Sequence, residues 1–264
     1  MSSRMRTTPA TASGDSAAAV DSEPSAGRRY LRTAAGLVGD LEEREWPDIQ
    51  AAATLVAEAL LAGASIHAFG SGHSHMLAEE VFYRAGGLVR VRPILFEGLM
   101  LHASAPLSTA LERLPGLATA ILDDHVVSAG DVLLIASNSG SNPVVTEMAR
   151  QARERGVRTI AITSLAHATS EETRQPREPR LHELADVTID NGGIIGDAAI
   201  AVDGLPTRVA PTSTVVGAAI LNAIVAEAVE RMARQGLIAE VFTSSNVAGG
   251  DARNERHLRQ PDRR

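Results

Sequence analysis

Two short segments of this chain carry the residue types that bind small anions. The first runs from Phe69 to His75 (FGSGHSH), and the second runs from Ser137 to Asn142 (SNSGSN). Each follows a short apolar run, and Pro143 follows the second segment, as is typical of the first residue of a helix. Glycine lets a backbone approach a ligand closely, while hydroxyls and the free N–H groups of a first helical turn can hold an anion. The two segments therefore predict a site for a phosphate monoester.

The residues expected to contact this ligand come from both segments. They are Ser71, Gly72, His73 and Ser74 in the first, and Ser137, Asn138, Ser139, Gly140 and Asn142 in the second. A simpler interpretation is also open, because Gly-rich turns between strands and helices are common in α/β proteins. Ser141 or Asn142 before a proline is also an ordinary helix cap.

The first segment partly matches two other kinds of site. Its G-x-G-x-x-H pattern resembles a dinucleotide fingerprint, but the third position is His75, and no acid follows at the usual distance of about 20 residues. His73 and His75, together with Glu79 or Glu80, supply some of the ligands of a metal site. Only part of that spacing is helical, and no third ligand is evident. We therefore expect neither a metal nor another cofactor.

A glutamate one turn beyond the first segment is a candidate general base. On a helix, Glu79 and Glu80 point about 100° apart, so at most one of them faces the ligand. A carboxylate held beside a phosphorylated sugar can move a proton between adjacent carbons. The alternative is that both are ordinary glutamates on a solvated helix face.

Composition excludes several classes of chemistry. The chain has 264 residues, a formal charge of −7, 25 basic residues that are all arginine, and no cysteine. Lysine Schiff bases, P-loop lysines, thiol nucleophiles, disulfides and cysteine-ligated zinc are therefore excluded. The negative charge and the 3% aromatic content argue against nucleic acid as a partner. The apolar stretch from Val215 to Val229 contains Asn222 and Glu227, so we expect no membrane span.

Alternating segment types place the two loops in a fold. Short apolar runs at 65–70, 88–96, 131–137, 157–163 and 187–191 predict strands, and helical patterns lie between several of them, for example at 76–85 and 143–155. This order predicts an α/β three-layer sandwich around a parallel sheet, with both loops at the carboxyl edge of the strands. Helical patterns also fill 30–61 and 213–235, residues 198–210 alternate as a short hairpin, and 166–180 has the composition of a loop.

The two ends of the chain differ from its middle. Residues 1–29 are rich in Ser, Thr, Ala and Pro and are expected to form a disordered arm without a secretory signal, which predicts a cytoplasmic protein. Residues 251–264 carry 5 arginines and 3 acids and are expected to form a solvated basic tail.

The segments FGSGHSHMLAEE, DVLLIASNSGSNP with VRTIAITS, and TSTVVGAAILNAIVAEAVE together resemble the SIS (sugar isomerase) domain family, and phosphoheptose-isomerase-like bacterial members in particular. The resemblance covers about residues 30–255 and implies a domain at 30–250. It implies a five-stranded parallel sheet with long terminal helices, and a homodimer or homotetramer whose phosphosugar sites are completed by a neighbouring subunit. It also implies that Ser71 and Ser74 belong to the first ligand loop, that Ser137, Ser139 and Asn142 bind the phosphate, and that Glu80 is the catalytic glutamate.

The chain also departs from phosphoheptose isomerases. Met76 stands where they have a zinc-binding histidine, and their last helix carries a catalytic histidine where this one has Asn222 and no histidine. Glu227 and Glu230 on that helix can supply a second acid or base, or form polar contacts at a subunit interface. We expect a sugar-phosphate isomerase with Glu80 as base and His75, or a residue of another subunit, as acid. A non-catalytic phosphosugar sensor is the alternative.

Overall fold

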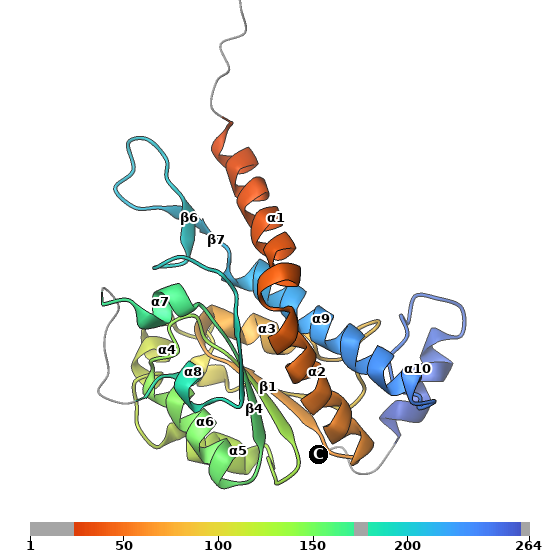
Figure 1. The fold of residues 1–264 in the computed structure, drawn as a ribbon. Helices are drawn as coiled ribbons and strands as arrows, with labels where there is room; N and C mark the ends of the chain where they lie inside the picture. Colours follow the sequence, from red (N-terminus) through yellow and green to blue (C-terminus); the bar gives the residue numbers. More distant parts are fainter. Residues whose placement is uncertain (1–23, 172–178, 260–264) are drawn as a thin grey trace, which may run out of the picture.

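The computed structural model describes residues 24–171 and 179–259, with a five-stranded parallel sheet at its centre (Figure 1). The strands are β1 (Ile66–Gly70), β2 (Val91–Ile94), β3 (Val132–Ala136), β4 (Arg158–Thr163) and β5 (Val187–Asp190). Their order in the sheet is β2-β1-β3-β4-β5. The predicted α/β class and the five parallel strands are confirmed.

The strand order reverses between β1 and β3. From β1 the chain moves outward to β2, and then returns across β1 to place β3 on its other side. Gly70 at the end of β1 pairs with Ala136 at the end of β3. In open parallel sheets, ligands bind beyond the carboxyl ends of the strands at such a reversal. The two predicted loops leave these two neighbouring strands.

Both faces of the sheet are buried, each in its own core. In β3, Val132, Leu134 and Ala136 pack on one side, and Leu133 and Ile135 pack on the other. This alternation requires an apolar residue at every position, which explains the continuous apolar runs in the sequence. The sheet is therefore a rigid base for the loops at its edge.

Helices form the two outer layers (Figure 1). One core includes residues of α2 (Trp46–Leu61), α3 (His75–Glu80) and α9 (Ser213–Arg234), and the other includes residues of α5 (Leu117–Asp124), α6 (Pro143–Glu154) and α8 (Leu181–Leu184). The remaining short elements are η1 (Gly72–Ser74), η2 (Glu97–Leu99), α4 (Ala105–Leu111) and α7 (Leu165–Thr169).

Helix α1 (Ala26–Arg44) projects from the body of the protein beside the hairpin of β6 (Ala198–Ile200) and β7 (Val209–Pro211) (Figure 1). The hairpin is the one predicted for residues 198–210. The Arg29 guanidinium donates to the Ala201 carbonyl (2.8 Å), and the Tyr30 hydroxyl donates to the Pro211 carbonyl (3.0 Å). Only Ala34 and Leu41 of α1 are buried within this chain.

Helix α9 is long and apolar enough, by length and composition, to cross a membrane. Here it packs against α2 and α3 in the core, with Val216, Ile220 and Ile224 on its buried side. Of its most apolar stretch, 39% is buried within this chain, and several further apolar residues pack partly buried against the core. Val215 is an exposed large apolar side chain of this helix.

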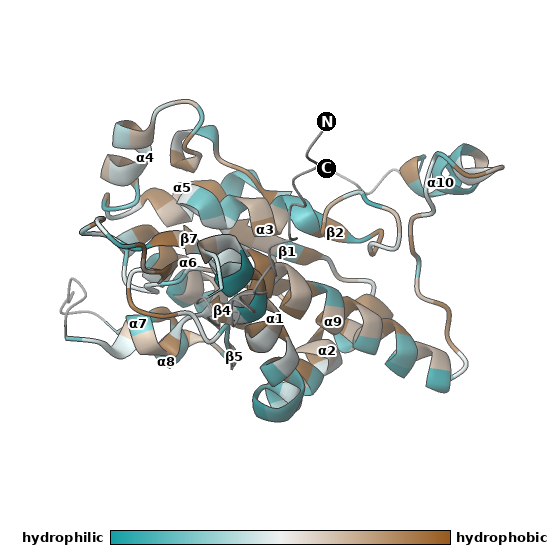
Figure 2. Ribbon diagram, turned by 90° about the horizontal axis from the view of Figure 1, so that it is seen from above, coloured by the Kyte–Doolittle hydropathy of each residue, from teal (hydrophilic) through white to brown (hydrophobic). Residues whose placement is uncertain are grey.

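Three local predictions differ from the structure. The helix expected over 76–85 ends at Glu80, because the backbone turns there and Tyr83 has a φ of 41°. The loop expected over 166–180 includes most of α7. The start of the solvated tail is instead helix α10 (Gly250–Leu258), beyond the end of α9 (Figure 2). Asn254 anchors α10, since its side chain accepts from the Thr243 N–H (2.9 Å) and donates to the Thr243 carbonyl (2.7 Å).

The predicted disordered arm falls mainly on residues outside those described. Helix α1 begins at Ala26, so the helical part of the chain starts before Tyr30, where the sequence pattern placed it.

Candidate functional site

The first loop turns sharply after β1. A Cβ at Gly70 would lie 2.2 Å from the Ser74 carbonyl oxygen, so only glycine fits there. The Ser74 N–H donates to the Ser71 carbonyl (3.1 Å), which closes the single turn η1 ahead of α3. Gly72 within this turn has a φ of 55°, a conformation that glycine adopts without strain.

The second loop joins β3 to α6. The Ser137 hydroxyl accepts from the Gly140 N–H (3.2 Å), and Pro143 begins the helix. The expected free N–H groups of the first helical turn are occupied: Val144 donates to the Glu112 carbonyl (3.2 Å), and Val145 donates to the Asn142 carbonyl (3.0 Å). That part of the prediction is wrong for α6, and a ligand must be held by the loop itself.

One cavity of about 370 Å³ brings the two loops together. Eight of the nine residues predicted to bind the ligand line it: Ser71, Gly72, His73, Ser74, Ser137, Asn138, Ser139 and Asn142. The ninth, Gly140, is buried behind the loop, where an added Cβ would lie 3.1 Å from the Cβ of Leu181. The structure thus places the predicted residues around one space, while their role in binding stays a prediction.

Asn138 has an unused donor at this cavity. The Gly193 N–H donates to Oδ1 of Asn191 (2.8 Å), so Nδ2 of Asn191 faces Asn138 and donates to its Oδ1 (2.8 Å). This sets the orientation of the Asn138 amide. Its Nδ2 is shielded from solvent and has no acceptor among the described residues. A buried donor without a partner costs about 1–3 kcal/mol, and a ligand reaches it only if the side chain moves.

Asn142 does not cap its helix. Its side chain makes no capping hydrogen bond to α6, and Nδ2 instead donates to Oε2 of Glu112 (3.0 Å). The Asn142 side chain therefore does not act as the helix cap that the simpler interpretation assigned to it. Glu112, directly after α4, also lines the cavity and is half-buried.

The predicted base and acid do not line this cavity. The Glu80 carboxylate accepts from Arg84, four residues further along the chain, and from Nδ2 of Asn222 on α9 (2.9 Å). The His75 ring is hydrogen-bonded through Nδ1 to the Gly72 carbonyl, so it supports the first loop from behind. Neither is among the lining residues of the described chain.

Sequence reasoning missed five polar residues that line the cavity: Thr109, Glu112, His167, Asp197 and Ser213. Asp197 accepts at Oδ1 from the N–H groups of Thr212 (3.1 Å) and Ser213 (2.9 Å), so it caps the start of α9. Asp197 precedes Ser213 by 16 residues, so no local capping signal in the sequence connects it to that helix. Glu112 and His167 have no local signal either.

His167 is held as a neutral imidazole. The Gly196 N–H donates to its Nδ1 (2.8 Å), so in the neutral ring Nε2 carries the hydrogen. Burial lowers the pKa of His167, Asp197 opposes this, and Arg180 adds to it. The ring therefore presents an N–H donor at neutral pH.

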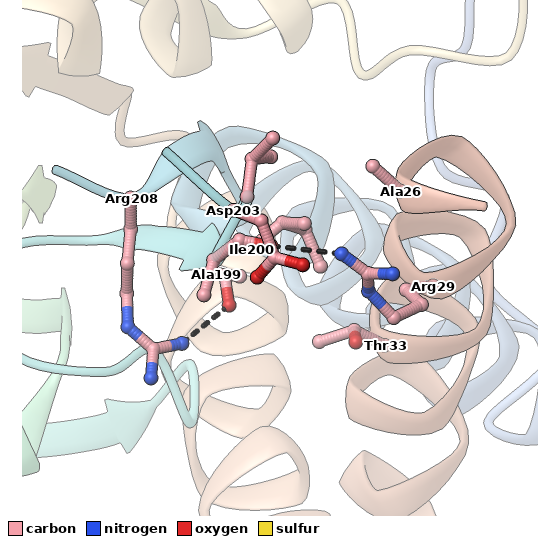
Figure 3. Close-up of a pocket in the computed structure, with 9 residues that line it drawn as sticks. Ala26, Arg29, Thr33, Ala199, Ile200, Asp203 and Arg208 are labelled. Carbon is pink, nitrogen blue, oxygen red and sulfur yellow. Dashed lines mark hydrogen bonds between the residues drawn. The ribbon is translucent and has the colours of Figure 1, made fainter. Parts of the chain in front are cut away.

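A larger cavity of about 580 Å³ lies between α1 and the β6–β7 hairpin (Figure 3). Its two arginines bind backbone carbonyls of the β6 segment: Arg29 donates to Ala201 and Arg208 donates to Ala199, both at 2.8 Å. The Arg29 contact joins the helix to the hairpin, and the Arg208 contact lies within the hairpin. No buried side-chain donor or acceptor of the described lining lacks a partner. Within the described ranges, no three His, Asp or Glu side chains gather as a metal site.

Sequence comparison places the chain in a family. Residues 29–164 match the SIS domain. The chain belongs to the SIS-domain family. A UPF0309 protein of Geobacillus thermodenitrificans is 45% identical to this SIS-domain protein over 216 residues, which are 82% of this chain and 87% of the relative. A UPF0309 protein of Listeria innocua is 42% identical over 226 residues, which are 86% of this chain and 92% of the relative.

Solved structures with a related fold are more distant from this SIS-domain protein. Phosphoheptose isomerase of Neisseria gonorrhoeae has 19% identity and a TM-score of 0.47, and the match covers 76% of this chain and 94% of that chain. The NanR protein of Vibrio vulnificus, complexed with ManNAc-6P, has 15% identity and a TM-score of 0.47, with 80% of this chain and 64% of that chain covered.

Proposed function

We propose that this protein binds a phosphorylated sugar in the cavity between its two serine-rich loops and interconverts aldose and ketose forms of it. The observation that carries the proposal is the cavity at the carboxyl edge of the sheet, which hydroxyl and amide side chains of both loops line. In a chain without lysine, neutral donors of this kind suit the oxygens of a phosphate monoester. Membership of the SIS-domain family supports the same class of ligand.

The two loops divide the ligand between them in this proposal. Ser137, Asn138 and Ser139 bind the phosphate, and Gly140 lets the loop curve behind it with a φ of 57°. The first loop, residues 71–74, binds the sugar. A phosphate fixed in this way holds the reacting carbons in one position, which is a large part of catalysis in small sites.

The protein acts in the cytoplasm as a homodimer or homotetramer in this proposal. The exposed apolar side chains of Leu31 and Val38 on α1 and of Val215 on α9 support association with a second copy. Neighbouring copies can then contribute further residues to each site.

A second candidate function is a phosphosugar sensor without catalysis. The contacts of Glu80 with Arg84 and Asn222, and of His75 with Gly72, favour it, because both side chains are occupied away from the cavity. A protein with the phosphate loop alone would bind the ligand and leave it unchanged.

Thermal unfolding with added ligands tests the binding. The panel contains inorganic phosphate, glucose 6-phosphate, fructose 6-phosphate, ManNAc-6P and arabinose 5-phosphate. A ligand at 100 times its Kd stabilises the folded protein by about 2.7 kcal/mol, which raises the Tm by several degrees. We expect a sugar phosphate to raise it more than inorganic phosphate does.

Two serines of the second loop provide a matched pair of variants. Ser139→Ala removes a hydroxyl at the cavity and is expected to weaken binding about 5- to 10-fold. Ser141→Ala removes one that is not among the described lining residues and is expected to leave binding unchanged. Equal effects of the two variants, or no shift with any sugar phosphate, would count against the proposal.

A further inference from the structure

The cavity contains a carboxylate that no sequence motif indicates. Glu112 stands between the two loops: its Oε2 accepts from Nδ2 of Asn142 (3.0 Å), and its Oε1 would lie 3.3 Å from a Cβ at Gly72. Its backbone carbonyl also accepts from the Val144 N–H (3.2 Å). The side chain is thus anchored at one oxygen, and the other oxygen faces the first loop.

A histidine that lines the same cavity can donate a hydrogen bond, whereas Glu112 can accept a proton. The backbone of α7 holds His167 in place, since its N–H donates to the Ser164 hydroxyl (3.1 Å). The Gly196 N–H occupies Nδ1, and the hydrogen of the neutral ring is therefore on Nε2. A neutral imidazole N–H donates a hydrogen bond to an oxygen that becomes negative, and such a donor stabilises an enediolate.

Electrostatic interactions determine the orientation of a phosphorylated ligand in this cavity. A phosphate dianion is repelled by the carboxylates of Glu112 and Asp197, which both line the cavity, and accepts hydrogen bonds from neutral donors such as the Ser137 and Ser139 hydroxyls. The phosphate therefore lies at the Ser137–Ser139 part of the second loop, and the uncharged carbons of the sugar lie nearer to Glu112.

We propose that Glu112 is the general base of the reaction and that His167 is the hydrogen-bond donor to the substrate carbonyl. This inference rests on the proposed function and assigns its chemistry to residues other than Glu80 and His75. Both of the new residues line the cavity, whereas neither of the earlier two does so in the described chain.

The proposed step is balanced without a co-reactant. A Glu112 oxygen takes the proton from the carbon beside the carbonyl. The electron pair of that C–H bond becomes part of the C=C bond of an enediolate, and the carbonyl π pair moves onto oxygen, where Nε2–H of His167 donates to it. The proton then returns to the former carbonyl carbon, and the hydroxyl proton passes from one oxygen to the other.

Hydrogen exchange with solvent isolates this step from binding. The protein is incubated in D2O with each sugar phosphate of the thermal-unfolding panel, and proton NMR follows the loss of the signal from the hydrogen beside the carbonyl. We expect exchange with the unaltered protein. General-base catalysis contributes about 10²- to 10⁴-fold, so Glu112→Gln should slow exchange at least about 100-fold.

The variants separate catalysis from structure. The Gln side chain can still accept from Asn142, so Glu112→Gln should keep the ligand-induced rise in Tm. Glu58→Gln, an exposed substitution on α2, is the matched control and should change neither reading. If Glu112→Gln lowers the Tm of the free protein, Glu112→Asp is the second variant: it keeps the charge, withdraws it from the substrate, and should also slow exchange.

The outcomes distinguish the two proposals. If no sugar phosphate raises the Tm, the proposed function itself is wrong. Binding with no exchange by the unaltered protein would overturn the assignment of Glu112 and leave the sensor. Exchange that survives in Glu112→Gln but is lost in Glu80→Gln would overturn it in favour of Glu80. The assignment of Glu112 would be supported if Glu112→Gln lost hydrogen exchange but still bound the ligand, and if Glu80→Gln kept hydrogen exchange.

Discussion

Two cavities in the described part of the chain differ in size and in how their polar side chains are used. The one between α1 and the β6–β7 hairpin is about 580 Å³ and contains two arginines, yet both donate to backbone carbonyls. The cavity at the carboxyl edge of the sheet is about 370 Å³ and has no arginine in its described lining. It does have the Asn138 amide, whose Nδ2 is buried without an acceptor.

Volume and charge are therefore poor guides to a binding site in this molecule. Arg29 of the larger cavity holds α1 to the hairpin, and Arg208 joins two parts of the hairpin, so both arginines have a structural role. In the smaller cavity, a ligand that drew the Asn138 side chain outward would satisfy a donor that folding left unpaired. An unpaired donor is the better indicator of a binding site. A donor that is already hydrogen-bonded must give up that bond to bind a ligand, whereas an unpaired donor loses nothing.

The largest expected effect comes from substituting Gly70, the glycine at which the first loop turns. Gly70→Ala places a Cβ 2.2 Å from the Ser74 carbonyl oxygen, so the backbone must move. We expect a loss of stability of about 2–4 kcal/mol, by analogy with other overpacked sites, and no measurable sugar-phosphate binding. Denaturant unfolding and the ligand-dependent Tm measure the two effects.

Gly36 provides the control for that substitution. A Cβ there has nothing within 4 Å, and the residue lies inside helix α1. Gly36→Ala is expected to stabilise the protein by up to about 1 kcal/mol and to leave binding unchanged. Normal binding by Gly70→Ala would show that the turn does not shape the site.

The comparison of the two cavities is tested directly by Asn138→Asp and Arg208→Ala. In Asn138→Asp, the Asn191 amide can still donate to Oδ1, but the free donor becomes a carboxylate oxygen. Loss of a hydrogen bond together with repulsion of the phosphate should weaken sugar-phosphate binding about 100-fold or more. Calorimetric titration measures the Kd.

Arg208→Ala removes a positive charge from the larger cavity. Because Arg208 is exposed and hydrogen-bonded only to the Ala199 carbonyl, we expect a stability change within about 0.5 kcal/mol and an unchanged Kd. A weaker Kd in Arg208→Ala with a normal one in Asn138→Asp would reverse the ranking of the two cavities.

The smallest expected effect is a pH dependence from His167. Its pKa is lowered by burial, so the group binds fewer protons in the folded than in the unfolded protein at mildly acidic pH. Well above pH 6.5, which is about the pKa of a histidine in the unfolded protein, His167 does not change the free energy of unfolding. As the pH drops from there toward the lower pKa of His167 in the folded protein, the free energy of unfolding decreases.

The variant His167→Asn isolates this contribution, because its side-chain oxygen can accept from the Gly196 N–H in place of Nδ1. Between pH 7.5 and pH 5.5, the Tm of the unaltered protein should fall more than that of His167→Asn. An equal fall in both would mean that burial does not hold His167 neutral.

Local patterns predicted much of this fold because the signals they depend on lie within single segments. Both faces of β3 are buried, so every residue from Val132 to Ala136 must be apolar. The short helix α10 was missed for the corresponding reason. It has few apolar residues and is held by Asn254, whose partner Thr243 stands outside the helix.

The sequence by itself determined the five parallel strands, the two loops at their carboxyl edge and the absence of any lysine or cysteine chemistry. Apolar runs, turn residues and composition are properties of the chain alone. Only the tertiary structure decided that Glu112, and not Glu80, stands beside the loops, and that the Asn138 amide has no acceptor among the described residues. Those facts depend on partners such as Asn142 and Asn191, which folding brings together from distant parts of the chain.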